Sequence, residues 1–308
     1  MKGPPAKKVV RYGFLLIAIG FGVWAVAGQW SAVTDAFARL SWFELAASLI
    51  AVVGALIAGM LMWRALLADL GSPLRFPDAA RIFFVGQLGK YIPGSLWPVL
   101  AQMEMGRDHG IPRTRSASAF FLTYPIYLAS GLTVALATLP LLAGDSVSQY
   151  GWLLLLIPVL VAGLQPGVVN WAINKALRLA RKPPLPTPLT RRGIVTSTGW
   201  AFAGWLAYGI HLAIIVHGLG ASGWQAALLS CGAFALAWCL GFLVVIAPAG
   251  AGVREVAMVA ALAPVLDRGS AIAAALCSRL IVSVGDFVCA AIAGAVTKKR
   301  VNVTETVE

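Results

Sequence analysis

Five charged residues stand inside or beside long apolar stretches of the chain, where a charge is costly. They are Lys90, Arg254, Glu255, Arg279 and Asp286. Placing a charged side chain at the centre of a bilayer costs roughly 2.5–3.5 kcal/mol on insertion scales, so such a charge is a functional candidate by default. Arginine presents a bidentate fork to phosphate oxygens, and lysine acts as a point charge. These residues therefore predict a site for an anionic, phosphate-containing group, in which the carboxylates position the cations.

Each of these charges also has a structural interpretation. Lys90 could extend its ammonium group to the membrane interface. Arg254 and Glu255 are neighbours at an expected helix start, where a glutamate complements the helix dipole. Arg279 and Asp286 lie on one helix face and could pair with each other. The sequence alone leaves both interpretations open.

Two segments that break helices stand next to these charges. Pro93 and Gly94 follow Lys90, and a second break, Pro248–Gly252, precedes Arg254. Proline removes a backbone donor and glycine favours non-helical dihedrals, so both segments should interrupt a helix. Broken backbone at membrane depth persists only where it is buried in protein or lines a watery cavity. We therefore include Pro93 and Gly94 among the candidate binding residues.

Two aromatic residues are candidates for shaping the same site. Trp97 follows the first break, and Tyr124 lies in the next apolar span. Aromatic residues in membranes more often serve as interface anchors or packing, and that alternative stays open. The sequence has no Asp-Asp pair, no GxSxG, HExxH or GxxxxGK[ST] motif, and no CxxC spacing among its 4 cysteines. We expect no catalytic residue, no metal and no cofactor.

The composition places these residues in a membrane protein. Of the 308 residues, 59% are hydrophobic and 12% charged, whereas soluble domains have roughly 45–50% apolar and 25% charged residues. Apolar spans that reach the ~20 residues needed to cross a bilayer occur at about 12–29, 43–67, 116–140, 151–172, 193–217 and 270–296. Two broken stretches, at about 79–104 and 225–266, are expected to form re-entrant hairpins. The expected fold is all-α and polytopic, with about six to eight transmembrane helices.

The order of elements repeats along the chain, because each half reads span, broken segment, span. We expect one transmembrane domain over 1–308, with halves 30–173 and 193–297 joined by a Pro-rich basic linker, 174–192. The chain has 24 Lys and Arg against 12 Asp and Glu, and the positive-inside rule places most basic residues and both termini in the cytoplasm. This topology inverts the two halves relative to each other, as in secondary transporters.

The residues around the two breaks resemble the signatures of the lysylphosphatidylglycerol synthase transmembrane family. Gly86–Trp97 looks like the first signature, and Pro248–Glu255 followed by Ser278–Leu280 looks like the second. Ala249 and Ala251 are a mild departure from the family's usual Pro-Gly-Gly-x-Gly-x-Arg-Glu run. The resemblance implies a lipid flippase. In two-domain members the membrane part moves an aminoacylated phospholipid made by a fused synthase domain, which this sequence does not contain.

The resemblance therefore predicts a translocase for an anionic lipid in the cell membrane. Related stand-alone members are thought to handle polyprenyl-phosphate-linked sugars, which makes such a sugar lipid the expected cargo. Aminoacylated phosphatidylglycerol is the alternative cargo, and an intramembrane lipid-modifying transferase and a membrane scaffold are the alternative functions. The expected partners are the lipid and a cytoplasmic glycosyltransferase or lipid synthase. No nucleic acid is expected, because no polar domain exists to bind it. The oligomeric state is left open.

Overall fold

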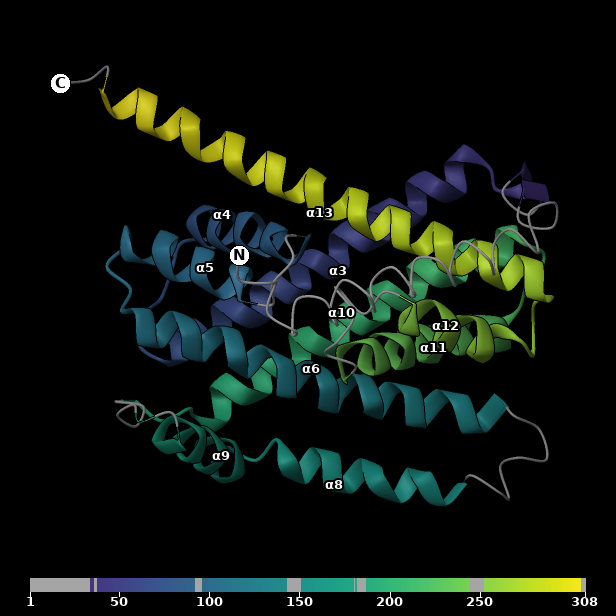
Figure 1. The fold of residues 1–308 in the computed structure, drawn as a ribbon, viewed down its shortest axis with the longest axis horizontal. Helices are drawn as coiled ribbons and strands as arrows, with labels where there is room; N and C mark the ends of the chain where they lie inside the picture. Colours follow the sequence, from purple (N-terminus) through teal and green to yellow (C-terminus); the bar gives the residue numbers. More distant parts are fainter. Residues whose placement is uncertain are drawn as a thin grey trace, which may run out of the picture.

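A computed structural model describes residues 34–35, 38–91, 96–142, 151–179, 181, 187–243 and 252–305. In these ranges the chain is helical, without strands (Figure 1). The α-helices, labelled as in Figure 1, are α3 (Trp42–Asp69), α4 (Phe76–Gln87), α5 (Trp97–Arg107), α6 (Arg113–Leu142), α8 (Leu156–Gly163), α9 (Pro166–Leu179), α10 (Arg191–Gly218), α11 (Trp224–Leu243), α12 (Val253–Leu262) and α13 (Arg268–Glu305). Two 3-10 helices are also present: η1 (Leu88–Tyr91) directly follows α4, and η2 (Gly151–Leu155) directly precedes α8. The expected all-α polytopic membrane fold is confirmed.

Five helices of the described chain are long and apolar enough to cross a membrane, namely α3, α6, α10, α11 and α13. Four of them, α3, α6, α10 and α13, coincide with spans expected from the sequence. A bent pair, α8 with α9, raises the count to up to six if it forms one span. The expected first span, 12–29, lies outside the described residues.

The structure differs from the sequence expectation over 151–172, where one continuous span was expected. Here α8 ends at Gly163, α9 begins at Pro166, and the two helices are bent by 66°. Proline has no N–H to donate and disfavours helical dihedrals in the residue before it, so Pro166 can begin a helix but does not continue α8.

The first broken stretch folds as two short helices, α4 and α5, that pack against each other. They have 12 and 11 residues. At 1.5 Å per residue each is only about 17 Å long, well short of the ~30 Å hydrocarbon core. Residues 92–95, with Pro93 and Gly94, lie outside the described ranges.

The second broken stretch is less symmetric than the first. Its leading helix, α11, has 20 residues and is long enough to cross a membrane, whereas α12 has 10. The re-entrant hairpins, the two inverted halves and the orientation of the termini stay predictions.

The last helix, α13, connects the parts of the fold. It packs against α3, α4, α10 and α12, and Figure 1 shows it lying along the molecule. A Cβ at Gly285 would lie 2.7 Å from Val52 Cγ1, so the glycine allows α13 to approach α3 closely. At its start, the Asp267 carboxylate accepts the Ser270 N–H at 3.0 Å, and hydrogen bonding from Ser270 lowers the pKa of Asp267.

A buried histidine joins three of the long helices. His211 of α10 is fully buried, and its Nδ1 lies 2.6 Å from Ser48 Oγ of α3. Its Nε2 lies 2.8 Å from Ser278 Oγ of α13. Both serines are buried as well. Because a buried polar group without a partner is costly, these hydrogen bonds fix α3, α10 and α13 relative to one another.

Replacing His211 by Ala should destabilise the protein. The change leaves the Ser48 and Ser278 hydroxyls without the ring nitrogens, which should cost about 1–3 kcal/mol. Thermal unfolding of the purified protein in detergent micelles measures this loss. Ile210→Ala is the matched control, because Ile210 is the neighbouring residue of α10 and is 48% exposed. An equal loss of stability in both variants would contradict the role given to His211.

Candidate functional site

Asp286 of α13 binds η1, the segment that comes before the first break. Its buried carboxylate Oδ2 lies 2.6 Å from Lys90 Nζ and accepts a hydrogen bond of 2.7 Å from Tyr91 Oη. Lys90 and Tyr91 are the last residues of η1, which directly follows α4. The Tyr91 ring stacks on Phe287 of α13, with ring centroids 5.2 Å apart. Lys90 is therefore held in an ion pair that joins two distant parts of the chain.

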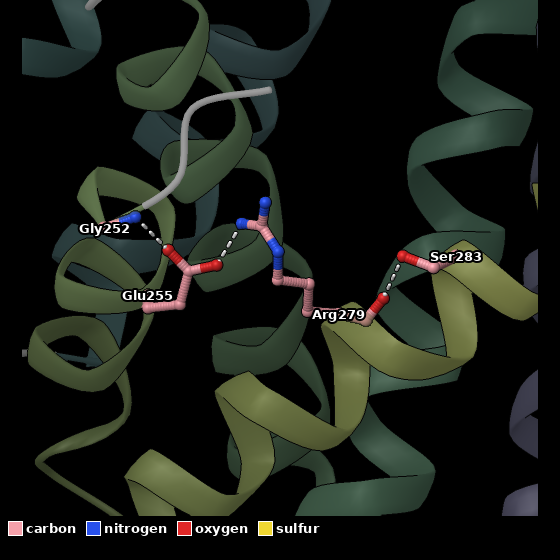
Figure 2. A network of polar contacts seen from close by, with 4 residues as sticks. All are labelled: Gly252, Glu255, Arg279 and Ser283. Atoms are coloured by element: carbon pink, nitrogen blue, oxygen red, sulfur yellow. Dashed lines mark hydrogen bonds and ion pairs between the residues drawn. The ribbon is translucent and has the colours of Figure 1, made fainter. Parts of the chain in front are cut away.

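Glu255 connects the second break to the same helix (Figure 2). One of its oxygens, Oε2, accepts the backbone N–H of Gly252 at 2.6 Å, and the other pairs with the guanidinium of Arg279. Gly252 precedes α12 and has a φ of 85°, a conformation that residues with a side chain rarely adopt. Ser283 Oγ donates to the Arg279 carbonyl at 2.9 Å. Glu255 thus holds the start of α12 and the side chain of Arg279 together.

The observed ion pairs differ from the pairing of Arg279 with Asp286 that the sequence suggested. Arg279 and Asp286 do not pair with each other in the described structure; each takes its partner from a different break. Arg279 pairs with Glu255 beside the second break, and Asp286 pairs with Lys90 beside the first. Because positions seven apart share a helix face, α13 holds η1 and the start of α12 along one side of itself.

Arg254 is the cation of this cluster that has no carboxylate partner among the described residues. Its guanidinium carbon lies 5.6 Å from the centroid of the Trp238 ring of α11, within the range of a cation–π interaction. Its Nε is buried and has no hydrogen-bond partner in the described chain. Gly241 of α11 makes room for this side chain, since a Cβ there would collide with Arg254 Cγ and lie 2.9 Å from Nε.

The unpaired guanidinium and the two ion pairs form one electrostatic cluster. Arg254 directly precedes Glu255, which pairs with Arg279, and Arg279 shares a face of α13 with Asp286, the partner of Lys90. The Coulomb attraction between opposite charges grows as the surrounding dielectric constant falls. An unpaired cation in a membrane protein therefore attracts an anion more strongly than the same cation does in water. We name Lys90, Arg254, Glu255, Arg279 and Asp286 the charged cluster.

A row of aromatic rings leads from Arg254 to Tyr124. Trp238 stacks on Phe242, with centroids 5.5 Å apart, and Phe242 stacks on Tyr124 of α6 at 4.8 Å. The sequence suggested Tyr124 as a site residue, and the structure places it two rings away from the ring that Arg254 contacts. Trp238 and Phe242 were missed. A tryptophan three residues before a helical glycine was the available signal, but it does not point to Arg254 without the fold.

The remaining site residues suggested by the sequence are Trp97, Pro93 and Gly94. Trp97 begins α5 and is 48% exposed, and its backbone lies against Gly89 of η1, where a Cβ would lie 2.9 Å from the Trp97 carbonyl carbon. Pro93 and Gly94 lie outside the described residues. In the described ranges no group of three or more His, Cys, Asp or Glu side chains could hold a metal ion.

The fold and the cluster define a polytopic membrane protein with a charged site among its helices. Residues 12–288 match the family described as the lysylphosphatidylglycerol synthase TM region, and the chain belongs to this family. The match spans both breaks and all five residues of the charged cluster. A comparison with curated proteins gave no match. The match confirms the resemblance seen in the sequence, and membership indicates a lipid-related, flippase-like role in a membrane.

The ion pair between Lys90 and Asp286 can be tested by a double-mutant cycle. We expect Lys90→Met and Asp286→Asn to be coupled by about 1–3 kcal/mol in the free energy of unfolding, because the two side chains are in contact and Asp286 is buried. The control pair is Arg113 and Glu104, which are 57% and 55% exposed and should be coupled by only about 0.2–1 kcal/mol. Equal coupling in the two cycles would argue against a structural pair at Asp286.

Proposed function

We propose that the protein is a lipid translocase that moves an anionic, phosphate-containing lipid between the leaflets of a membrane. One observation carries the proposal: Arg254 is a partly buried cation without a carboxylate partner in the described chain, and its neighbour Glu255 is already engaged by Arg279. A charge at such a place is costly unless something neutralises it. A lipid phosphate supplies the missing negative charge.

The headgroup would bind at the charged cluster while the lipid tail stays in the bilayer. The Arg254 guanidinium can offer two parallel N–H donors to phosphate oxygens. Lys90 and Arg279 would add to the positive potential, and Asp286 and Glu255 hold these two cations in place. Next to the cluster, Leu280, Val284 and Phe287 of α13 expose 61%, 48% and 52% of their surface, which suits contact with lipid chains.

Exchange between leaflets requires that the site open to either side of the membrane. Secondary transporters with broken helices do this by rocking one half against the other around a central site. η1, before the first break, and the start of α12, after the second, each form one ion pair with α13. Rearrangement of α4–α5 or α11–α12 around α13 would expose the headgroup to one side and then the other.

The proposed cargo is a polyprenyl-phosphate-linked sugar, and the alternative is an aminoacylated phosphatidylglycerol. Both carry the phosphate that the cluster would bind, and family membership supports a lipid-related role without distinguishing the two. The proposed partner is a cytoplasmic glycosyltransferase or lipid synthase that makes the lipid. A translocase of this kind performs no covalent chemistry, so we propose no catalytic residue.

The charged cluster gives less support to a transferase. Such an enzyme needs a free acid or base beside a nucleophile. Each carboxylate of the cluster is instead engaged twice: Asp286 by Lys90 and Tyr91, and Glu255 by Arg279 and the Gly252 N–H. A scaffold that works through the basic linker is separable by experiment, since deleting 180–192 should abolish partner recruitment by a scaffold and leave translocation by a flippase intact.

Replacing Arg254 by Gln should reduce translocation by about ten- to a hundredfold, which corresponds to the ~1.5–3 kcal/mol of hydrogen bonds to a charged group. The measurement is leaflet accessibility of a fluorescent polyprenyl-phosphate sugar in proteoliposomes. The control is Arg268→Gln, because Arg268 is an exposed arginine at the start of α13. Full activity of the Arg254 variant, in protein shown to be folded, would remove the central residue of the proposal.

Replacing Gly241 by Ala tests the position of Arg254 without changing any charge. The added methyl group would displace the arginine side chain, so we expect a several-fold loss of translocation in the same assay. Gly54→Ala is the matched control, because Gly54 is also a helical glycine of a long span and a Cβ there meets nothing within 4 Å. Equal activity of the two variants would show that the packing of Arg254 on α11 does not matter for transport.

A further inference from the structure

The charge balance of the cluster bears on how many negative charges the cargo carries. From this balance we infer that the site selects a lipid whose headgroup has a single negative charge, a phosphodiester, over a lipid linked through a diphosphate. The inference rests on the proposed function, because it concerns the cargo of the same site. It also separates the two candidate cargoes, since a lysylated phosphatidylglycerol carries a net positive charge.

The count follows from the contacts of the five side chains. Lys90 is paired with Asp286, and Arg279 is paired with Glu255. Arg254 has no carboxylate partner within the described ranges, and its sequence neighbour Glu255 is already paired with Arg279. Two neutral pairs and one unpaired guanidinium leave the cluster with a single positive charge.

The two carboxylates are held so that this balance persists when a ligand binds. Asp286 accepts a hydrogen bond from Tyr91 besides its contact with Lys90. Glu255 accepts the Gly252 N–H besides its contact with Arg279. A phosphate would have to break two contacts to displace either carboxylate, whereas Arg254 has no carboxylate to give up within the described chain.

Membrane surroundings make the balance decisive. A charge left without compensation in the low-dielectric interior is disfavoured, so the best ligand brings the cluster to neutrality. A phosphodiester with one negative charge does so. A diphosphodiester with two leaves the complex with one negative charge in excess, and a cationic aminoacyl headgroup leaves positive charge in excess. We expect a preference of at least about tenfold for the singly charged lipid.

The test compares three fluorescent lipids in proteoliposomes. Two share the same polyprenyl chain and sugar and differ only in a monophosphate or a diphosphate linkage, and the third is lysyl phosphatidylglycerol. The inference expects the monophosphate-linked lipid to move fastest in the wild-type protein. Equal or faster movement of the diphosphate-linked or the lysylated lipid overturns the inference and leaves a translocase. Failure to move any of the three, by protein shown to be folded, overturns the proposed function itself.

Three variants change the balance in a controlled way. Asp286→Asn raises the net charge of the cluster by one and should shift the preference toward the diphosphate-linked lipid. Lys90→Gln lowers it by one and should weaken transport of both phosphate lipids. The double variant Lys90→Gln/Asp286→Asn has the original net charge and should return to the original preference. An unchanged preference in Asp286→Asn overturns the inference.

A variant at the second carboxylate keeps the test valid if Asp286→Asn fails to fold. Glu255→Gln makes the same change in charge at the other ion pair, and the amide oxygen can still accept the Gly252 N–H. It should shift the preference in the same direction as Asp286→Asn. Opposite shifts in the two folded variants would show that local geometry, and not net charge, selects the lipid.

Discussion

The cost of a charge inside a membrane governs the arrangement of this protein. Four charged side chains meet that cost by pairing, and the two pairs join η1 and the start of α12 to one face of α13. At Asp286 the partners come from far apart in the sequence, since Tyr91, the neighbour of Lys90, lies 195 residues away, whereas Glu255 and Arg279 are 24 residues apart. The pair at Asp286 is reinforced by the hydrogen bond from Tyr91, whereas the start of α12 has the Glu255–Arg279 pair as its ionic contact with α13 in the described chain.

Packing by small residues makes this arrangement geometrically possible. Gly285 lets α13 approach α3, and Gly241 leaves space for the Arg254 side chain against α11. Arg254 then contacts the Trp238 ring, which the row of stacked rings connects to α6. The glycines therefore decide how near the helices come, and the distances between helices decide which charges can meet.

The sequence predicts the long elements well and their contacts poorly. The spans α3, α6, α10 and α13 follow from apolar length alone, because about 20 apolar residues have no other stable place than a membrane. The bend between α8 and α9 was missed although Gly163 and Pro166 were visible, since hydropathy does not register direction. The identity of the charged residues was predictable from their cost. Their pairing was not, because spacing along α13 says nothing about which partner η1 or α12 brings.

His211 gives α13 a second kind of anchor, close to the charged cluster. Ser278, which forms a hydrogen bond with its ring, directly precedes Arg279, so one turn of α13 contacts both the His211 hydrogen-bond network of α3 and α10 and the charged cluster. A helix held this way is a poor candidate for the moving part of a transport cycle. In the proposed transport cycle α3, α10 and α13 would therefore form a fixed frame. The motion that passes a headgroup across the membrane would then belong to the helices next to the two breaks, α4, α5, α11 and α12.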